Sequence, residues 1–177
     1  MNEVLKAIEQ RSSTRSFTEE KLTEAELNAL IEAGLQAPTA ANRQEIHFTV
    51  VDSSNPILAE IEREMRASST RQFPEQNFYY GAPTVLILSG DKAFPWTPVD
   101  AGIAVENIAL AAEGLGLGSL IIGCIKGAMT GEKQAAFSDT LKLPEGYAFE
   151  VAIAVGHKAA GKTPHTYSAE KNVTIIR

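Results

Sequence analysis

Apolar residues alternate along the chain between helical spacing and short unbroken runs. Spacing of three to four residues predicts amphipathic helices, whereas short apolar runs between turn residues predict buried strands. We expect helices over residues 3–10, from Thr23 to Pro38, from Asn55 through Met65, over 99–115 and over 133–137. We expect strands over residues 47–51, 84–89, 119–124 and 149–155.

Local signals fix several ends of these elements. Thr23 followed by Glu26 is a capping box, and Pro38 ends the same helix. Residues 67–83 are polar and aromatic, which indicates a long loop of the kind that is often functional. Residues 91–98 contain Phe94, Pro95, Trp96 and Pro98 and are expected to be irregular.

Two apolar stretches predict a second subunit. The helix at 99–115 is apolar around nearly its whole circumference, so it must be covered on all sides. Val173–Ile176 looks like a strand without a local partner, and strand exchange between two subunits would supply one. We therefore expect one α+β or α/β domain over residues 1–177, with about four core strands, that forms a homodimer.

Composition narrows the class of protein. The chain has 177 residues, is 44% hydrophobic and carries a net charge of −6, so it can form an ordinary core and lacks the basic surface that nucleic acid requires. Its single cysteine and the absence of a signal-peptide pattern indicate a cytoplasmic protein. Ile108–Ile125 contains Glu113 and four glycines, which indicates a helix, a turn and a strand and not a membrane span.

The densest polar cluster is Arg11-Ser12-Ser13-Thr14-Arg15. Guanidinium groups offer forked, charge-assisted donors, and hydroxyls add more, so such a cluster suits a phosphate. The alternative interpretation is a cationic helix end followed by a solvated turn.

A second cluster, Ala37-Pro38-Thr39-Ala40-Ala41-Asn42-Arg43-Gln44, combines small residues with amide side chains. Small residues let the backbone approach a flat ligand, and amides both donate and accept hydrogen bonds. The alternative is an ordinary loop after a proline-terminated helix.

Other patterns give little support for a site. Gly114-Leu115-Gly116-Leu117-Gly118-Ser119 follows a helix and lacks the third glycine of a dinucleotide-binding fingerprint. The three histidines are scattered, so no metal site is predicted, and Cys124 is expected to be a buried, inert thiol. Aromatic residues in the two long loops either roof a pocket or pack beneath the loops, and the candidates are Tyr79, Tyr80, Phe94 and Trp96.

Four of these segments, in this order, resemble the FMN-dependent nitroreductase family. Arg11-Ser12-Ser13-Thr14-Arg15-Ser16-Phe17 is similar to its R-x-S-x-R-x-F signature, and Ala37–Gln44 to its A-P-S-x-x-N-x-Q loop. Phe78–Pro83 is similar to the family's entry into the central sheet, and residues 100–107, running on to Gly114–Gly116, to its long central helix and the turn after it.

The resemblance implies an α+β fold with a central, mostly antiparallel sheet flanked by helices, and a homodimer with FMN at the interface. It implies that Arg11, Ser12 and Ser13 hold the phosphate and that Arg15 lies along the flavin. Ile122 and Gly123 would line one ring face, and Lys162 and His165 would reach the phosphate from the tail. The second subunit would contribute Pro38, Thr39, Ala40 and Asn42.

The implied activity is hydride relay from NAD(P)H through the flavin to a small organic acceptor, nitroaromatic or quinone-like, by a ping-pong mechanism. No catalytic side chain is expected, because the flavin carries the chemistry. Alternatives are a flavin-binding or storage protein, and a same-fold enzyme for reductive dehalogenation or flavin fragmentation. Glu45-Ile46 departs from the Pro and Trp that usually follow the glutamine, so this wall of the site differs from the family pattern.

Overall fold

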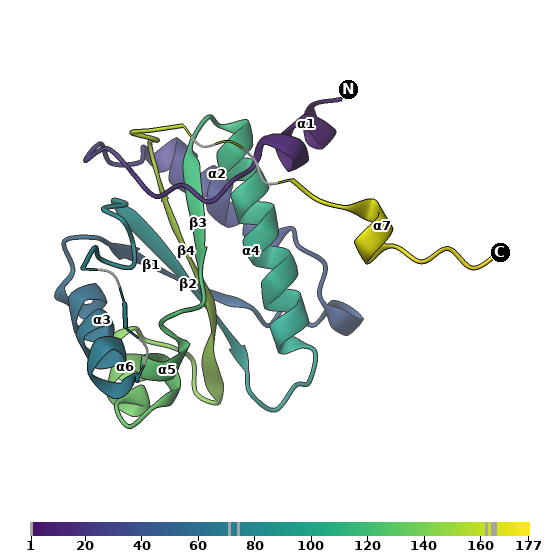
Figure 1. The fold of residues 1–177 in the computed structure, drawn as a ribbon. Coiled ribbons are helices and arrows are strands. Elements are labelled where there is room, and N and C mark those ends of the chain that lie inside the picture. Colours follow the sequence, from purple (N-terminus) through teal and green to yellow (C-terminus); the bar gives the residue numbers. More distant parts are fainter. Residues whose placement is uncertain (1, 71, 74, 162, 164–165) are drawn as a thin grey trace.

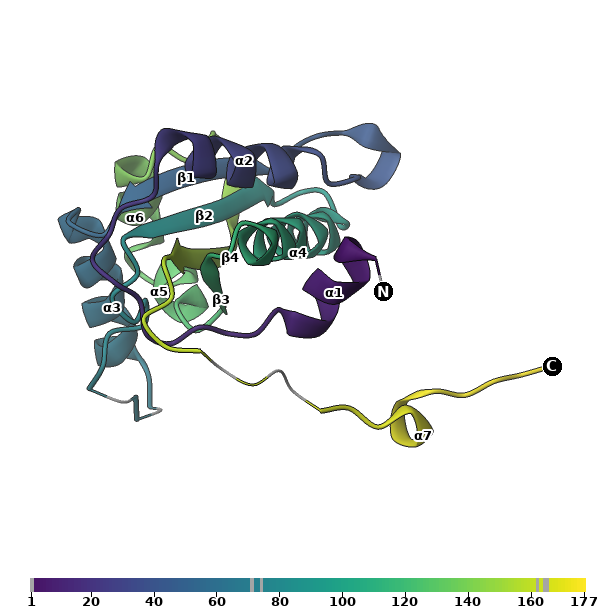
Figure 2. The same cartoon turned by 90° about the horizontal axis from the view of Figure 1, so that it is seen from above.

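A four-stranded antiparallel sheet lies between two layers of helices in the computed structural model (Figures 1 and 2). The structure describes residues 2–70, 72–73, 75–161, 163 and 166–177. The strand order across the sheet is β1 (His47–Asp52), β2 (Thr84–Asp91), β4 (Tyr147–Gly156) and β3 (Gly118–Ile122). The predicted α+β class and antiparallel sheet are confirmed, and each predicted strand lies within a few residues of its observed position.

The two central strands are buried on both faces. In β2, Val85 and Ile87 point into one core, and Leu86 and Leu88 point into the other. All four are fully buried, as the unbroken apolar run predicted. In this strand order β1 and β3 are the outer strands, and they form the edges at which other segments can pair.

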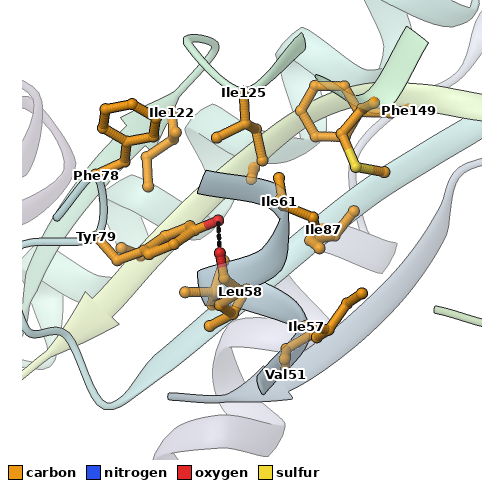
Figure 3. Close-up of a cluster of buried hydrophobic side chains, with 14 of the residues drawn as sticks. Val51, Ile57, Leu58, Ile61, Phe78, Tyr79, Ile87, Ile122, Ile125 and Phe149 are labelled. Carbon is orange, nitrogen blue, oxygen red and sulfur yellow. Dashed lines mark hydrogen bonds between the residues drawn. The ribbon is translucent and has the colours of Figure 1, made fainter. Parts of the chain in front are cut away.

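One face of the sheet is covered by three helices, α3 (Pro56–Ser68), α5 (Lys126–Thr130) and α6 (Gln134–Thr140). The Asn55 side chain caps α3 by accepting a hydrogen bond from the Ile57 amide at 3.1 Å. Ile57, Leu58 and Ile61 pack from α3 into this core, where Figure 3 shows them beside Tyr79. Helix α5 was not predicted, because five residues are too few to display a helical period.

The opposite face is covered by α2 (Glu24–Leu35) and α4 (Thr97–Gly114). The predicted capping box at the start of α2 is confirmed: the Glu26 amide donates to Thr23 Oγ1 at 3.2 Å, and the Thr23 amide donates to Glu26 Oε2 at 2.8 Å. Helix α4 begins at Thr97, so the end of the segment expected to be irregular is helical.

The two ends of the chain lie on the outer side of α4. Helix α1 (Glu3–Gln10) leaves Val4, Leu5 and Ile8 exposed, and α4 leaves Val99 and Ile103 exposed. The tail extends away from the body of the molecule, with the short helix α7 (Ala169–Asn172) near its end (Figure 1).

The strand predicted at Val173–Ile176 is not formed in the part of the tail that the structure describes. Ile175 and Ile176 are exposed there. A strand needs a neighbouring edge to satisfy its backbone groups, and the tail of a single chain extends away from both edges of the sheet.

Candidate functional site

The segment that follows α1 is held along the free edge of β3. Ser13 pairs with Ser119 in parallel orientation, and the Thr14 amide donates to the Ser119 carbonyl at 2.8 Å. Thr14 is buried against Gly118, where a Cβ atom would lie 2.7 Å from Thr14 Oγ1. Glycine at 118 therefore permits this close approach, and the parallel direction carries the chain from Ser13 to Arg15 toward the end of β3.

The same segment is fixed on its other side by the chain that leaves β4. The Thr18 amide donates to the His157 carbonyl at 3.0 Å, and the Ala159 amide donates to the Ser16 carbonyl at 3.0 Å. This polar segment has no helical or strand pattern in the sequence, and backbone hydrogen bonds on both sides hold it in place.

A cavity of about 290 Å³ opens where this segment meets the end of β3. Four of the predicted site residues line it, namely Arg15, Tyr80, Ile122 and Gly123. A Cβ atom added at Gly123 would have no neighbour within 4 Å, so the backbone there faces open space. Phe78, another aromatic residue of the long loop expected to be functional, also lines the cavity. The lining residues that sequence reasoning missed are Phe73, Gln76, Leu120, Ile121 and Cys124.

Tyr80 and Arg15 lie against each other in the lining of this cavity. The guanidinium carbon of Arg15 lies 5.9 Å from the centroid of the Tyr80 ring, within the range of a cation–π contact. Tyr80 has a φ of 55°, a left-handed conformation that is costly for a bulky residue. Asn77 supports this turn, because its side-chain oxygen accepts the amides of Tyr79 at 3.1 Å and Gly81 at 3.2 Å.

Tyr79 was predicted beside Tyr80 as a substrate-lining residue, and the structure places its side chain in the core instead. Its hydroxyl donates to the Leu58 carbonyl at 3.3 Å (Figure 3). Burial raises the pKa of Tyr79 above its ordinary value, so the phenol stays protonated. With the left-handed turn at Tyr80, the Tyr79 ring lies in the core and the Tyr80 ring lines the cavity.

Cys124 is exposed and lines the cavity, so the expectation of a buried thiol is wrong. The strand ends at Ile122, and Cys124 lies in the connection to α5, outside the layers of the core.

Arg11 lies at the junction of α1 and α4. Its amide ends α1 by donating to the Ala7 carbonyl at 2.8 Å, and its Nε lies 3.4 Å from Glu106 Oε1. Ser12 and Ser13 are half-buried beside it. Lys162 and His165, the predicted phosphate contacts from the tail, lie outside the described residues.

The second predicted cluster is separate from this cavity within one chain. Pro38 and Thr39 lead into a short 3-10 turn at Ala40–Asn42, and the Ala40 amide donates to Asp100 Oδ2 in the first turn of α4 at 2.9 Å. Phe94 and Trp96 lie at the same end of α4, with the Arg43 guanidinium 4.2 Å above the Phe94 ring. Phe94 and Trp96 therefore do not line the cavity that Arg15 and Tyr80 share.

The donor set suits a flat ligand with an anionic end. Two guanidinium groups and three hydroxyls lie on one held segment, beside an open glycine and three aromatic rings. Among the described residues, no group of three or more His, Cys, Asp and Glu side chains is placed to hold a metal ion. In the same part of the chain, no helix is both long and apolar enough to cross a membrane.

Comparison with known proteins agrees with this fold. Residues 8–157 match the nitroreductase family. A nitroreductase with bound FMN from Desulfitobacterium hafniense is 33% identical and superposes with a TM-score of 0.90 over 100% of both chains. A nitroreductase with bound FMN from Bacteroides fragilis is 28% identical, with a TM-score of 0.90 over 100% of both chains.

A curated relative described as an FMN reductase with NAD(P)H, from Bacillus subtilis, is 27% identical over 90% of this chain and 67% of its own length. The family match and the likeness to nitroreductases with bound FMN define the class of protein as a nitroreductase-like flavin oxidoreductase. The chain belongs to the nitroreductase family and is an enzyme of that family.

Proposed function

We propose that this protein binds FMN and passes a hydride from NAD(P)H, through the flavin, to a small organic acceptor such as a nitroaromatic or a quinone. The observation that carries the proposal is the meeting of Arg15, the last residue of the Arg11–Arg15 segment, with the open backbone of Gly123 at one cavity. The FMN-bound relatives with the same fold support it.

A bound FMN would supply the redox chemistry, by taking up a hydride at its N5 atom and giving it to the second substrate in the same place. The side chains of the protein bind, orient and exclude water. Arg11, Ser12 and Ser13 hold the phosphate through charge-assisted and hydroxyl hydrogen bonds. Arg15 places a positive charge beside the ring system, which stabilises its reduced, anionic form.

The walls of the cavity decide what reaches the flavin. Gly123 would let a bound ring system approach the backbone closely, because nothing lies within 4 Å of a Cβ placed there, and Ile122 lines the same cavity. Phe73 and Tyr80 present aromatic surface to a flat acceptor and keep water away. A ping-pong cycle follows, because both substrates use the same cavity face in turn.

The complete site requires a second subunit in this proposal. Val4, Leu5, Ile8, Val99 and Ile103 form an exposed apolar surface on α1 and α4, which is the surface expected at a homodimer interface. Pro38, Thr39, Ala40 and Asn42 of one subunit would then contact the flavin of the other.

Spectroscopy of the purified protein tests the proposal. The expected result is a yellow protein whose oxidised-flavin absorption is bleached by NADH or NADPH and restored by p-benzoquinone or a nitroaromatic. Bleaching without reoxidation by either acceptor would contradict the proposed acceptor class. Binding of FMN without any bleaching would favour a flavin-storage protein, and failure to take up FMN would overturn the proposal as a whole.

A further inference from the structure

The loop between α2 and β1 is held in an unusual backbone shape. Ala41, Asn42 and Gln44 have φ values of 53°, 53° and 52°. Each is a left-handed conformation that L-residues other than glycine adopt rarely and at a cost. Such a loop keeps its shape only where surrounding contacts determine it.

Two side chains hold the loop through its backbone amides. Thr39 Oγ1 accepts the Gln44 amide at 2.9 Å, within the loop. Asp100 Oδ2 accepts the Ala40 amide at 2.9 Å, and Asp100 is buried in the first turn of α4. Asp100 therefore ties the start of the loop to the first turn of α4.

A second carboxyl group is buried beside this contact. Glu45 is 7% exposed, and neither of its carboxyl oxygens has a hydrogen-bond donor among the described residues. The carboxyl group of Asp100 lies close enough to Glu45 to act on its titration both through its charge and through a hydrogen bond. Two carboxyl groups can hydrogen-bond each other only when one of them carries a proton, and two buried negative charges repel strongly.

The surroundings of Glu45 favour its protonated form. Burial, followed by the hydrogen bond and charge of the neighbouring Asp100, raises the pKa of Glu45 above its ordinary value of 4.5, against the opposing effect of the Glu45 backbone amide. Arg43 acts in the opposite direction, but its guanidinium is paired with Asp91 at 3.1 Å and lies over the Phe94 ring. The positive charge of Arg43 is therefore already paired with Asp91, and it does not take the place of a proton in balancing the charges of Glu45 and Asp100.

We propose that Glu45 and Asp100 are positioning residues that share one proton, and that this pair fixes the loop in the shape that presents Asn42 to the flavin of a second subunit. The inference rests on the proposed function, and it adds a pH-dependent control of flavin affinity. Glu45 stands where the family pattern usually has proline, so the control is expected to be a property of this chain.

The sign of the pH dependence follows from the pair. As pH rises through the raised pKa of Glu45, its proton leaves, and two negative charges remain buried together. The loop then loses its fixed shape, and FMN affinity falls. If FMN binding raises the pKa of Glu45 by one unit, FMN affinity should be about tenfold lower at a pH above the titration of Glu45 than at a pH below it.

The test is FMN affinity, measured by quenching of flavin fluorescence from pH 5.5 to 9, for the wild type and two variants. Glu45→Gln mimics the protonated carboxyl, because its amide donates to Asp100 at every pH. It should bind FMN as tightly as the wild type does at low pH and lose less affinity as the pH rises. Asp100→Ala removes the acceptor of the Ala40 amide and should bind weakly throughout.

A second measurement detects the titration of Glu45 in the flavin-free protein. The thermal stability of the flavin-free wild type should decline as pH rises from the ordinary glutamate range toward the raised pKa, because the unfolded chain loses this proton first. Glu45→Gln should lack this part of the decline. Glu60→Gln, at an exposed glutamate of α3, is the matched control and should follow the wild type in both measurements.

Identical pH profiles for the wild type and Glu45→Gln, in affinity and in stability, would overturn the inference. If Glu45→Gln does not fold, Asp100→Asn serves instead, since its amide oxygen still accepts from Ala40 and it removes the second charge. A wild type that takes up no FMN at any pH is the separate failure of the proposed function, and it also ends the role of the loop in flavin affinity. The stability profile would then still show whether the proton is shared.

Discussion

At the scale of single residues, neighbouring side chains have different roles because the backbone separates them. Tyr79 and Tyr80 look equivalent in the sequence, but one donates to the Leu58 carbonyl in the core and the other meets Arg15 at the cavity. The deciding feature is the positive φ of Tyr80, held by Asn77. No pattern of hydrophobic and polar residues specifies that angle, so residue types predicted the aromatic character of the cavity but not which rings line it.

The first prediction concerns Arg11, the residue that ends α1. Arg11→Ala removes a charge-assisted contact to the FMN phosphate, which is worth about 1.5–3 kcal/mol, so the dissociation constant for FMN should rise about ten- to a hundredfold. Titration of the flavin-free protein with FMN measures it. Glu106→Ala is the control, because it removes only the partner of Arg11 and should leave FMN affinity near that of the wild type. An Arg11→Ala protein that binds FMN like the wild type would remove Arg11 from the phosphate site.

The second prediction concerns the amide of Asn42. Asn42→Gly removes the side chain, including the hydrogen bond that its Oδ1 accepts from Gln44 Nε2 at 3.3 Å, and keeps the positive φ free of strain. We expect FMN affinity to fall about three- to tenfold, the effect of one hydrogen bond of ordinary strength. Asn42→Ala should lose more, since alanine disfavours this backbone conformation. Unchanged affinity in Asn42→Gly would show that its amide does not reach the flavin.

At the scale of elements, the sequence predicted best where a local signal and a tertiary contact agree. The capping box at Thr23, the start of α3 at Asn55-Pro56 and the unbroken apolar run of β2 all have the predicted form. Prediction failed where the partner is distant or absent. Helix α5 is too short for a period, and Val173–Ile176 has no strand beside it in one chain.

The capping box gives the third prediction. Thr23→Ala removes the side-chain cap of α2 and should lower the free energy of unfolding by about 0.5–2 kcal/mol, measured by urea denaturation at pH 7.

The hydrogen bond from the Thr23 backbone, followed by that from its hydroxyl, lowers the pKa of Glu26 below 4.5. The stability that the Glu26 carboxylate contributes is therefore present above that pH and is lost as the pH falls through the lowered pKa. Glu26→Gln should lose less stability on acidification than the wild type, and equal losses would contradict the assignment.

At the scale of the whole molecule, the two predicted ligand clusters lie against different parts of α4. Arg11 pairs with Glu106, whereas Ala40 donates to Asp100 in the first turn. One chain therefore does not bring both clusters to a single cavity. Ile103 lies on α4 between Asp100 and Glu106, and this exposed side chain and those of α1 offer apolar surface on which a second copy would pack. In the proposed dimer, each flavin would be held by the Arg11–Arg15 segment of one subunit and the 38–42 loop of the other, which would account for two separate flavin-type motifs in one sequence.

The fourth prediction follows from that surface. Ile103→Asp places a charge on an α4 side chain that is 36% exposed in the single chain and buried in the proposed dimer. A lone chain tolerates a charge at this position, but a dimer interface does not, because the carboxylate would be buried without a partner. The variant should fold, run as a monomer in gel filtration with light scattering, and lose FMN, since each flavin needs the 38–42 loop of the other subunit. Ala59→Asp, at an exposed position of α3 on the opposite side of the sheet, should remain dimeric and yellow. An Ile103→Asp protein that stays dimeric would place the interface elsewhere, whereas a monomer that retains FMN would show that one chain holds the cofactor alone.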